Sequence, residues 1–395
     1  MRRILVLGGG FAGLWSALSA ARQPDALGLG PEELEIVLVN RDAWHGIRVR
    51  NYEADLDAIR VPLAAVLDPI GVRLVEGEVT DIDLARRSVA VSGAGLPYDR
   101  LVFALGSSLA RPAIPGLAEH GFDIDTFAGA RRLADHLAGL GGRSASPGRD
   151  TVLVVGAGLT GIEAATEMAG RIGPAGRVIL ADHAPQVGSD MGDSARPVIE
   201  TALAALGVET RMGVSVAAVA AGGATLSTGE VIPAATVIWC AGMRASPLTD
   251  RFPVERDRLS RLPVDPTLKI IGREAEFAVG DSARAMVDDG HASVMSCQHS
   301  RPMGRFGGHN VVADLLGRPL LPMRIEWYTT ILDLGSWGAV YTEGWDRRVA
   351  TQGAVAKQTK QIINRQRIYP PLTGDRRAIL DAAAPVIQAP PQRFR

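Results

Sequence analysis

The chain has 395 residues, 47% hydrophobic and 22% charged, so its length predicts two or three domains with a large buried core. Its 42 lysines and arginines nearly balance 43 aspartates and glutamates, and the formal net charge of -1 argues against nucleic-acid binding. Cys240 and Cys297 are its only cysteines. They stand far apart and outside any metal-ligand spacing, which argues against a disulfide scaffold or a metal site and indicates a reducing, cytoplasmic setting.

The chain begins with the pattern of a nucleotide-binding turn. Ile4–Leu7 is a short apolar run suited to a buried parallel strand, and a small, apolar helix is expected over residues 14–21. Between them the glycines have G-x-G-x-x-G spacing, which permits a tight turn, close approach of a pyrophosphate, and packing of the helix on the strand. The predicted contacts of this first module are Gly8, Gly10, Phe11, Ala12 and Gly13.

Two features of the sequence bear on the location of the protein in the cell. The first strand follows at once without a small-residue cleavage site, and no apolar run in the chain approaches the roughly 18 residues of a membrane span. We therefore expect a chain that neither crosses a membrane nor is exported by this route.

The second strand of the first module ends at Asn40. An acidic residue usually bonds the ribose at this place, and the neutral amide of Asn40 would make a weaker hydrogen bond. Arg41 and His45 follow within reach of adenine or phosphate groups, although a solvated loop is the expected role of each.

The same pattern returns 148 residues later, counting from Ile4 to Val152. Val152–Val155 is the expected strand, and a helix should run from Ile162 to about Arg171. The strand after it ends at Asp182, whose charge would repel a 2'-phosphate and so favours NADH over NADPH. The predicted contacts of this second module are Gly156, Gly158, Thr160, Gly161 and Asp182.

The repetition continues downstream, since "YDRLVFALGS" (residues 98–107) has the form of "ATVIWCAGM" (residues 235–243). Each is an apolar strand that ends in small residues, and we expect cofactor contacts at Ala104, Gly106 and Gly242. Cys240 takes the place of Ala104 and is expected to be a small strand-end residue. Two complete modules predict two dinucleotides, a held flavin and an exchangeable nicotinamide between which hydride passes directly.

With both modules in place, the sequence resembles the flavoproteins that have two dinucleotide-binding domains, a superfamily of disulfide reductases, ferredoxin reductases and type II NADH:quinone oxidoreductases. The likeness covers about residues 1–320 and includes "AEFAVGDSAR" (residues 275–284), which matches a strand-Gly-Asp motif that holds FAD. It implies that Gly280 and Asp281 contact FAD; an ordinary helix N-cap is the alternative for Asp281.

The resemblance implies an α/β fold of tandem Rossmann-like FAD and NAD domains, the NAD domain inserted in the FAD domain, with a small C-terminal α+β region. The expected domains are residues 1–115 and 264–322 for FAD, 116–263 for NAD, and 323–395 for the C-terminal region.

Two catalytic assignments rest on the resemblance to type II NADH dehydrogenases. It places Glu163 at the nicotinamide, with a first-turn glutamate that complements the helix dipole as the alternative. In "SCQHS" (residues 295–299) it places Gln298 at the flavin and the quinone, with capping or surface placement as the alternative. Cys297 and His299 depart from the motif, and packing or solvent exposure is expected of them. The redox cysteines of disulfide and sulfide:quinone reductases are missing from the sequence.

The C-terminal region bears on the electron acceptor. Residues 325–345 are rich in aromatic side chains and predict two strands about Gly335. A basic amphipathic helix should follow, with Val355, Thr359, Ile362, Ile363 and Gln366 on one face and Lys357, Lys360, Arg365 and Arg367 around it. Such a helix can lie on anionic lipid, while packing on the sheet or a homodimer contact is the alternative.

These observations predict a FAD-dependent NADH dehydrogenase, most similar to type II NADH:quinone oxidoreductase, in the cytoplasm or peripheral to the inner face of the cell membrane. NADH would reduce FAD and a quinone would reoxidise it. One alternative is a soluble NAD(P)H-dependent reductase of a ferredoxin-like protein or small oxidant. Another is an NADH-binding flavoprotein that acts as a sensor or interaction protein.

Overall fold

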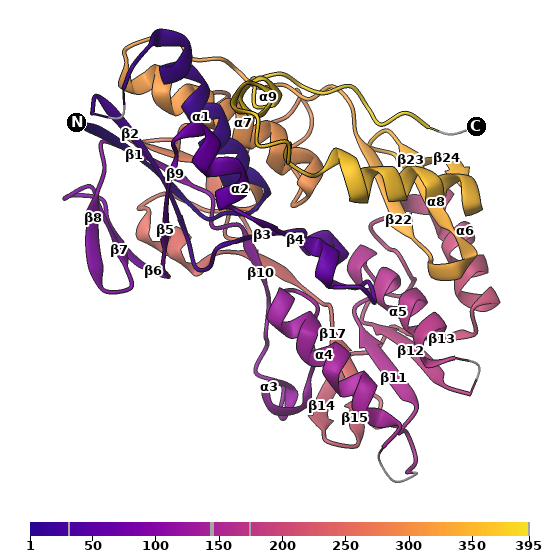
Figure 1. Cartoon of the computed structure of the whole chain (residues 1–395). Helices are drawn as coiled ribbons and strands as arrows, with labels where there is room; N and C mark the ends of the chain where they lie inside the picture. Colours follow the sequence, from indigo (N-terminus) through magenta and orange to yellow (C-terminus); the bar gives the residue numbers. More distant parts are fainter. Residues whose placement is uncertain (31, 143–145, 174, 394–395) are drawn as a thin grey trace.

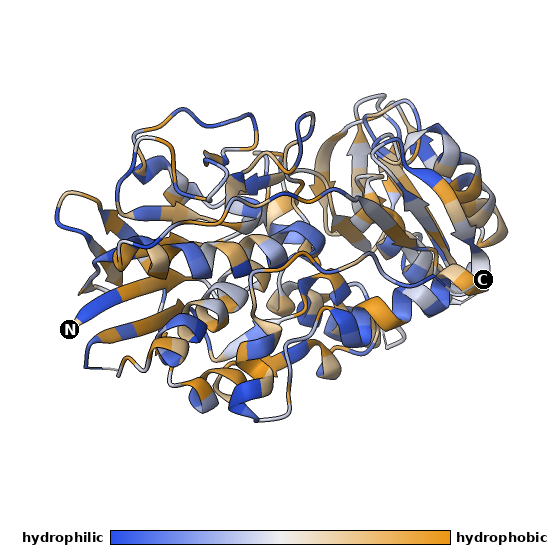
Figure 2. Cartoon of the chain, turned by 90° about the horizontal axis from the view of Figure 1, so that it is seen from above, coloured by the Kyte–Doolittle hydropathy of each residue, from blue (hydrophilic) through white to orange (hydrophobic). Residues whose placement is uncertain are grey.

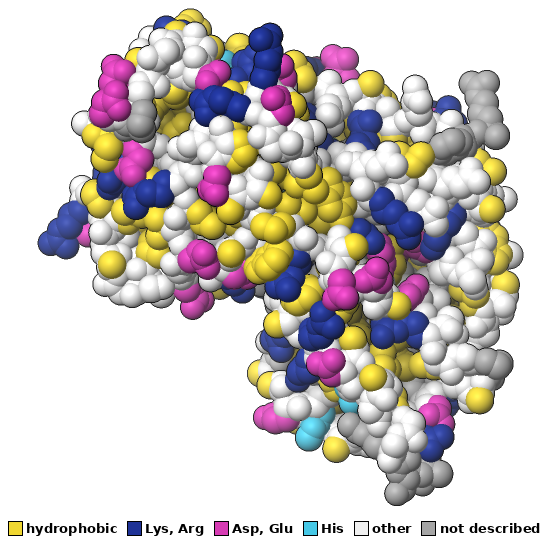
Figure 3. All heavy atoms as spheres, in the orientation of Figure 1, with side chains coloured by type: hydrophobic (Ala, Val, Ile, Leu, Met, Phe, Trp, Pro, Cys, Tyr) yellow, Lys and Arg dark blue, Asp and Glu magenta, His cyan; other side chains and the backbone are white. Residues whose placement is uncertain are grey.

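Two parallel sheets organise the chain, and each grows from one of the two glycine repeats (Figure 1). The computed structural model describes residues 1–30, 32–142, 146–173 and 175–393. Figure 3 shows two lobes set at an angle with an open notch between them. The predicted α/β architecture of Rossmann-type modules is confirmed.

The first sheet has the strand order β20-β9-β1-β2-β5, with every neighbouring pair parallel. Its strands are β1 (Arg2–Leu7), β2 (Leu34–Asn40), β5 (Arg73–Glu76), β9 (Arg100–Phe103) and β20 (Glu276–Ala278). Because β20 comes from late in the sequence, the Gly-Asp segment that follows it lies in the first module. The domain boundaries themselves stay a prediction.

Two helices pack closely against each other on this sheet, α1 (Phe11–Leu27) and α7 (Cys297–Leu315). A Cβ atom added to Gly304 would lie 2.3 Å from the Ala12 carbonyl oxygen, and one added to Gly308 would lie 2.2 Å from that of Ser16. The two glycines therefore allow the helix backbones to touch. Helix α1 begins three residues earlier than predicted, because Gly10 is its N-cap.

The second sheet has the order β13-β12-β11-β17, again with parallel neighbours. Its strands are β11 (Thr151–Val155), β12 (Arg177–Asp182), β13 (Val208–Met212) and β17 (Thr236–Trp239), and its helices are α4 (Phe127–Leu140), α5 (Leu159–Ile172) and α6 (Gly192–Ala205). Hydrophobic residues follow the central strands of both modules, and hydrophilic residues gather in the outer loops (Figure 2). Both cores therefore centre on their sheets.

The repeat extends further than the sequence indicated, because each module also carries a three-stranded antiparallel sheet. These are β6 (Val79–Asp83), β7 (Ser88–Val91) and β8 (Ala94–Pro97) in the first module, and β14 (Val216–Ala220), β15 (Gly223–Leu226) and β16 (Val231–Pro233) in the second. Further short elements before residue 290 include β3 (Trp44–Gly46), β4 (Arg60–Pro62), α2 (Ala64–Leu67), α3 (Leu117–His120), β19 (Leu262–Pro263) and β21 (Ala283–Arg284).

A two-stranded antiparallel ladder joins the modules. It pairs β10 (Ser107–Leu109), which follows Gly106, with β18 (Met243–Ala245), which follows Gly242. The chain thus leaves the first module through β10 and returns from the second module through β18, and these two segments lie side by side.

The C-terminal region lies mostly beside the second module, and its last helix returns to pack on α1 of the first module (Figure 1). Its strands are β22 (Thr329–Asp333), β23 (Ala339–Glu343) and β24 (Arg348–Gln352), followed by α8 (Gly353–Ile362), a π-helical turn (Ile363–Arg367) and α9 (Arg376–Ala382). The two strands predicted about Gly335 are confirmed, and β24 was not predicted. No helix in the described part of the chain has the length and apolar character needed to span a membrane.

Candidate nucleotide and flavin sites

Both glycine turns have the same geometry, and each needs its first and third glycine. Gly8 has a φ of +101° and Gly156 has a φ of +106°, a conformation that side-chain-bearing residues rarely adopt. A Cβ atom on Gly13 would lie 1.8 Å from the Gly8 carbonyl oxygen, and one on Gly161 would lie 1.6 Å from that of Gly156. The helix therefore packs on the turn only with glycine at these places.

The middle glycines differ, because nothing in the protein itself requires them. Gly10 and Gly158 are the N-caps of α1 and α5, with φ values of -73° and -78° that any residue adopts. A Cβ atom on either would meet nothing within 4 Å. No side chain caps the free N–H groups of either helix. Each helix thus faces open space with unpaired donors, which fits the pyrophosphate of FAD and of NAD.

The other predicted turn residues lie at these helix starts. Phe11 and Ala12 are the first two residues of α1, and Thr160 is the second residue of α5.

Asn40 and Asp182 have equivalent structural roles in the two modules. The Asn40 side-chain oxygen accepts from the Gly9 N–H at 2.8 Å, and its amide nitrogen donates to the Asp42 carbonyl at 2.8 Å. Asp182 accepts from the Ala157 N–H and from the Ala184 N–H, the latter at 2.7 Å. Both side chains therefore brace their glycine turns, and their contacts with ribose stay predictions.

Arg41 and His45, which follow Asn40, differ in their exposure to solvent. Arg41 is exposed, as expected of a solvated loop, but that expectation is wrong for His45, which is fully buried. Its Nδ1 lies 2.8 Å from the Gly9 carbonyl oxygen and its ring meets Phe11 edge-on. Burial lowers the pKa of His45 to about 4, so the ring is neutral and supports the turn.

Ala104 and Cys240 occupy matching strand ends, as predicted. The Ala104 carbonyl oxygen and the Cys240–Ala241 backbone each lie against the first glycine of their module. Gly106 and Gly242 follow with φ values of +66° and +81°. Burial raises the pKa of the Cys240 thiol to about 12, so this residue is a packing residue and not a thiolate.

Asp281 lies in a short 3-10 turn (Gly280–Ser282) at the end of β20. Its carboxylate accepts hydrogen bonds from the hydroxyls of Ser107 at 2.7 Å and Ser300 at 3.3 Å. The alternative interpretation as a helix N-cap is wrong, because Ser296 caps α7. The turn therefore holds the carboxylate between β10 and α7. Its role toward FAD stays a prediction.

Asp281→Ala is expected to lower FAD affinity about 10- to 100-fold. A lost hydrogen bond to a charged group costs about 1.5–3 kcal/mol, and each 1.4 kcal/mol is tenfold. The measurement is flavin retained after dialysis against graded FAD. Asp190→Ala, at an exposed carboxylate, is the control and should retain flavin as the wild type does. Equal retention by both variants would reject Asp281 as a FAD ligand.

Glu163 makes a buried ion pair that the sequence did not reveal. Its Oε1 accepts from the Lys360 Nζ at 2.6 Å and from the Asp333 N–H at 3.0 Å. The two side chains are 10% and 8% exposed. Burial raises the pKa of Glu163, while Lys360 opposes that rise. The alternative of a first-turn glutamate is wrong, because Glu163 is the fifth residue of α5 and ties this helix to α8 and β22. Its role at the nicotinamide stays a prediction.

Gln298 lies in the first turn of α7, and only one of its two side-chain amide atoms is hydrogen-bonded. Its Oε1 accepts from the Thr329 hydroxyl at 3.2 Å, while its buried Nε2 has no hydrogen-bond partner among the described residues. Surface placement is therefore wrong for Gln298. Its neighbours pack as expected: Cys297 lies in an apolar cluster with Phe11, and His299 is fully buried beside Tyr328 and Trp345.

The basic helix is arranged differently from the prediction. Lys360 is buried with Glu163, Lys357 bonds Asp333 at 2.5 Å, and Arg367 donates to the Ala389 carbonyl. Of the four predicted outward cations, Arg365 alone is exposed. The predicted apolar face is also wrong in part, since Ile362 is exposed.

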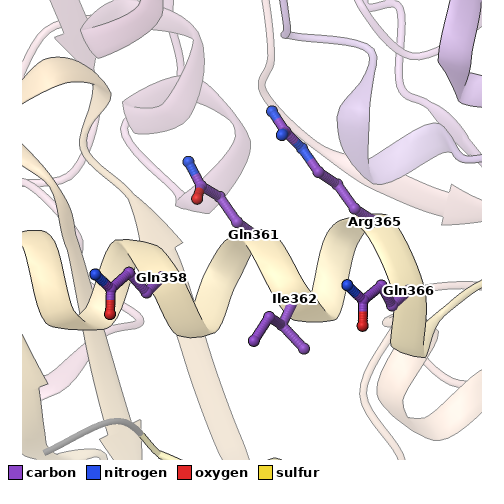
Figure 4. A pocket seen from close by; sticks show the side chains of 5 residues that line it. All are labelled: Gln358, Gln361, Ile362, Arg365 and Gln366. Carbon is purple, nitrogen blue, oxygen red and sulfur yellow. The ribbon is translucent and has the colours of Figure 1, made fainter.

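The outer face of α8 and of the π-helical turn that follows it is instead mostly neutral. A surface hollow of 340 Å³ is lined by Gln358, Gln361, Ile362, Arg365 and Gln366, whose side chains are labelled along the helix in Figure 4. Attachment to anionic lipid through this helix stays a prediction with one exposed cation to support it.

The comparisons with known proteins agree with this geometry. A family model described as pyridine nucleotide-disulphide oxidoreductase matches residues 2–304. The chain belongs to this family. It is therefore an oxidoreductase whose two modules serve FAD and NAD, and the predicted cofactors and enzyme class are confirmed. No cluster of three or more metal-ligating side chains occurs in the described ranges.

Two relatives and one solved structure are similar to this chain over most of its length. An NADH dehydrogenase-like protein of Mycobacterium tuberculosis is 59% identical over 400 residues, covering 99% of this chain and all of the relative. The demethylphylloquinone reductase NdbB of a Synechocystis species is 30% identical over 351 residues, covering 86% of each chain. The structure of NDH2 from Plasmodium falciparum in complex with NADH aligns with a TM-score of 0.76 and 12% identity, covering 97% of each chain.

Proposed function

We propose that this oxidoreductase transfers hydride from NADH to FAD and passes the electrons on to a quinone. Both donor and acceptor have support in the relatives, since one is named for NADH oxidation and another for reduction of a quinone. FAD supplies the two-electron exchange between the nicotinamide and the acceptor. The protein binds the two cofactors and the acceptor and aligns them for electron transfer.

The observation that carries the acceptor is the unpartnered amide nitrogen of Gln298. A buried N–H donor without an acceptor is costly and is retained where a ligand completes the bond. A quinone offers carbonyl oxygens, which only accept, and so matches this donor. The other end of the amide is occupied, since the Thr329 hydroxyl donates to its oxygen at 3.2 Å.

Proton supply also fits this chemistry. Reduction of a quinone to a hydroquinone takes two electrons and two protons, whereas NADH delivers one hydride, so one proton must come from the protein or solvent. Lys360 holds a proton at Nζ against the Glu163 carboxylate, and its Nζ also lies 3.2 Å from the Ile331 carbonyl. We infer that this buried pair orients a proton donor between α5 and the C-terminal sheet.

A thiol relay has no support in the described residues. Both cysteines are free thiols, and burial raises the pKa of each. Electrons would therefore pass directly between the flavin and the acceptor.

A soluble short-chain quinone is expected to reoxidise the reduced flavin at least tenfold faster than oxygen. Stopped-flow absorbance of the NADH-reduced protein measures this directly. Reoxidation by a ferredoxin-like protein and not by quinone would favour the reductase alternative. Negligible turnover with every acceptor, despite tight NADH binding, would favour the sensor.

The same experiment on Gln298→Leu tests the acceptor site. The variant should lower kcat/KM for quinone about tenfold, since one lost hydrogen bond costs about 1.4 kcal/mol. Flavin reduction by NADH should be unchanged. Gln361→Leu on the outer face of α8 is the matched control. Equal kinetics in both variants would remove Gln298 from the acceptor site.

A further inference from the structure

We propose that Arg301 and Arg305, which lie over Trp15 between α1 and α7, bind a small oxyanion, the carboxylate or phosphate group of a ligand other than the two dinucleotides. The proposal does not depend on the quinone. It assigns a function to two charged side chains that have no role in the proposed binding of flavin or nicotinamide.

The two guanidinium groups share one aromatic ring. Arg301 and Arg305 stand one turn apart on α7, and their Cζ atoms lie 5.0 Å and 4.2 Å from the centre of the Trp15 ring. Like charges at this spacing repel, which disfavours the arrangement unless a negative group relieves it. The indole offsets part of that cost by cation–π attraction.

Both side chains are buried without a counter-ion. Arg301 is 6% exposed and Arg305 is 2% exposed. In the parts of the chain that the structure describes, neither guanidinium takes part in a salt bridge or a side-chain hydrogen bond, and the Nε atom of each is buried without a partner. By contrast, the buried Lys360 has its glutamate. Unpaired buried charges of this kind are rare unless a ligand neutralises them.

The surroundings add one donor and a further cation. The Trp15 Nε1–H is also buried without a partner. Arg301 acts electrostatically on His45, and Arg367 acts on both arginines. Burial first, and then the neighbouring arginine, lowers the pKa of Arg301 to about 9. The neighbourhood therefore has an excess of positive charge, which comes from Arg301, Arg305 and Arg367.

This excess specifies the ligand chemistry. A guanidinium fork binds two oxygens of one group, and carboxylate and phosphate have that geometry, whereas chloride does not. Through His45 the site adjoins the start of α1, but its donors are side chains, whereas the two pyrophosphate sites are formed by backbone N–H groups at the starts of α1 and α5. Trp15, by contrast, lies one turn inside α1.

The test uses the FAD-loaded protein and its thermal unfolding midpoint. Potassium phosphate and sodium benzoate are each titrated against potassium chloride at equal ionic strength, so that free phosphate and an organic carboxylate are distinguished. A saturable rise with either anion beyond that with chloride is expected, because a ligand that binds only the folded state stabilises it. The midpoint should respond to the anion that the site prefers.

Arg301→Met/Arg305→Met removes both charges and keeps much of the apolar volume. It should weaken the apparent anion affinity at least tenfold and, without anion, should unfold at a higher temperature than the wild type. Arg100→Met is the matched control, because its guanidinium is paired with Asp314; it should unfold at a lower temperature and keep the anion response. Gly158→Trp, which fills the NAD turn, should also keep the response.

An equal anion response in the double variant, or the absence of a saturable response to both anions in the wild type, would overturn the proposal. Should the double variant not hold FAD, Arg305→Lys replaces it. This variant keeps the charge and loses the fork, so it should weaken anion binding at least fivefold, and unchanged affinity would equally overturn the proposal.

Discussion

A Gly158→Trp variant is expected to keep its FAD and to lose NADH-dependent flavin reduction by about 100-fold or more. The backbone at Gly158 is ordinary, and a side chain there would enter empty space, so the fold should tolerate the change. The indole would occupy the place of the NAD pyrophosphate and remove at least two charge-assisted hydrogen bonds of about 1.5–3 kcal/mol each. Stopped-flow reduction by NADH and flavin content measure the two effects.

Gly10→Trp is the matched control, because Gly10 has the same backbone and the same open space in the first module. It should lose FAD. Loss of FAD in Gly10→Trp, together with loss of NADH-dependent reduction alone in Gly158→Trp, would assign flavin to the first turn and nicotinamide to the second. If Gly158→Trp released FAD and Gly10→Trp kept it, the assignment of the modules would be reversed.

Breaking the Glu163–Lys360 pair is expected to lower the free energy of unfolding by about 3–5 kcal/mol, the usual cost of leaving one buried charge unpaired. Glu163→Gln leaves Lys360 alone, and Lys360→Met leaves Glu163 alone. The double variant should be less destabilised than the sum of the two, because it removes both charges together. Denaturant unfolding of the four proteins measures the coupling.

The exposed pair Arg177–Glu209 in the same module is the control, with side chains 44% and 39% exposed. Its double-mutant cycle should give about 0–1 kcal/mol. Similar coupling energies for the two pairs would mean that water reaches Lys360 and that the pair does not lock α5 to α8.

The glycine turns could be predicted because their requirement is local. Gly13 and Gly161 each approach a carbonyl oxygen five residues earlier, so the whole constraint fits in one short stretch of sequence. The same holds for the strand ends at Ala104 and Cys240. The antiparallel sheets of each module were missed since their strands are short and their alternation is weak.

The position of Lys360 could not be predicted for the opposite reason. Helical periodicity placed Lys360 among outward cations, but its partner Glu163 is 197 residues away in the sequence. Nothing near Lys360 in the sequence distinguishes a buried lysine from a solvated one. Ser107 and Ser300, which hold Asp281, were missed likewise, because small polar residues carry no signal of a distant carboxylate.

The ladder between β10 and β18 has the symmetry of a homodimer contact. Ser107 and Met243 follow equivalent glycines, as do Leu109 and Ala245 two residues later. The register pairs Ser107 with Ala245, Leu109 with Met243, and the central Ser108 with its own equivalent, Arg244. Two identical modules related by a two-fold axis would pair in this isologous way. Since nucleotides bind beyond the carboxyl ends of parallel strands, and each ladder strand follows such an end, the axis turns the two binding edges toward each other. We therefore expect a single chain with this ladder to hold its hydride donor and acceptor face to face, as two subunits would across a two-fold axis.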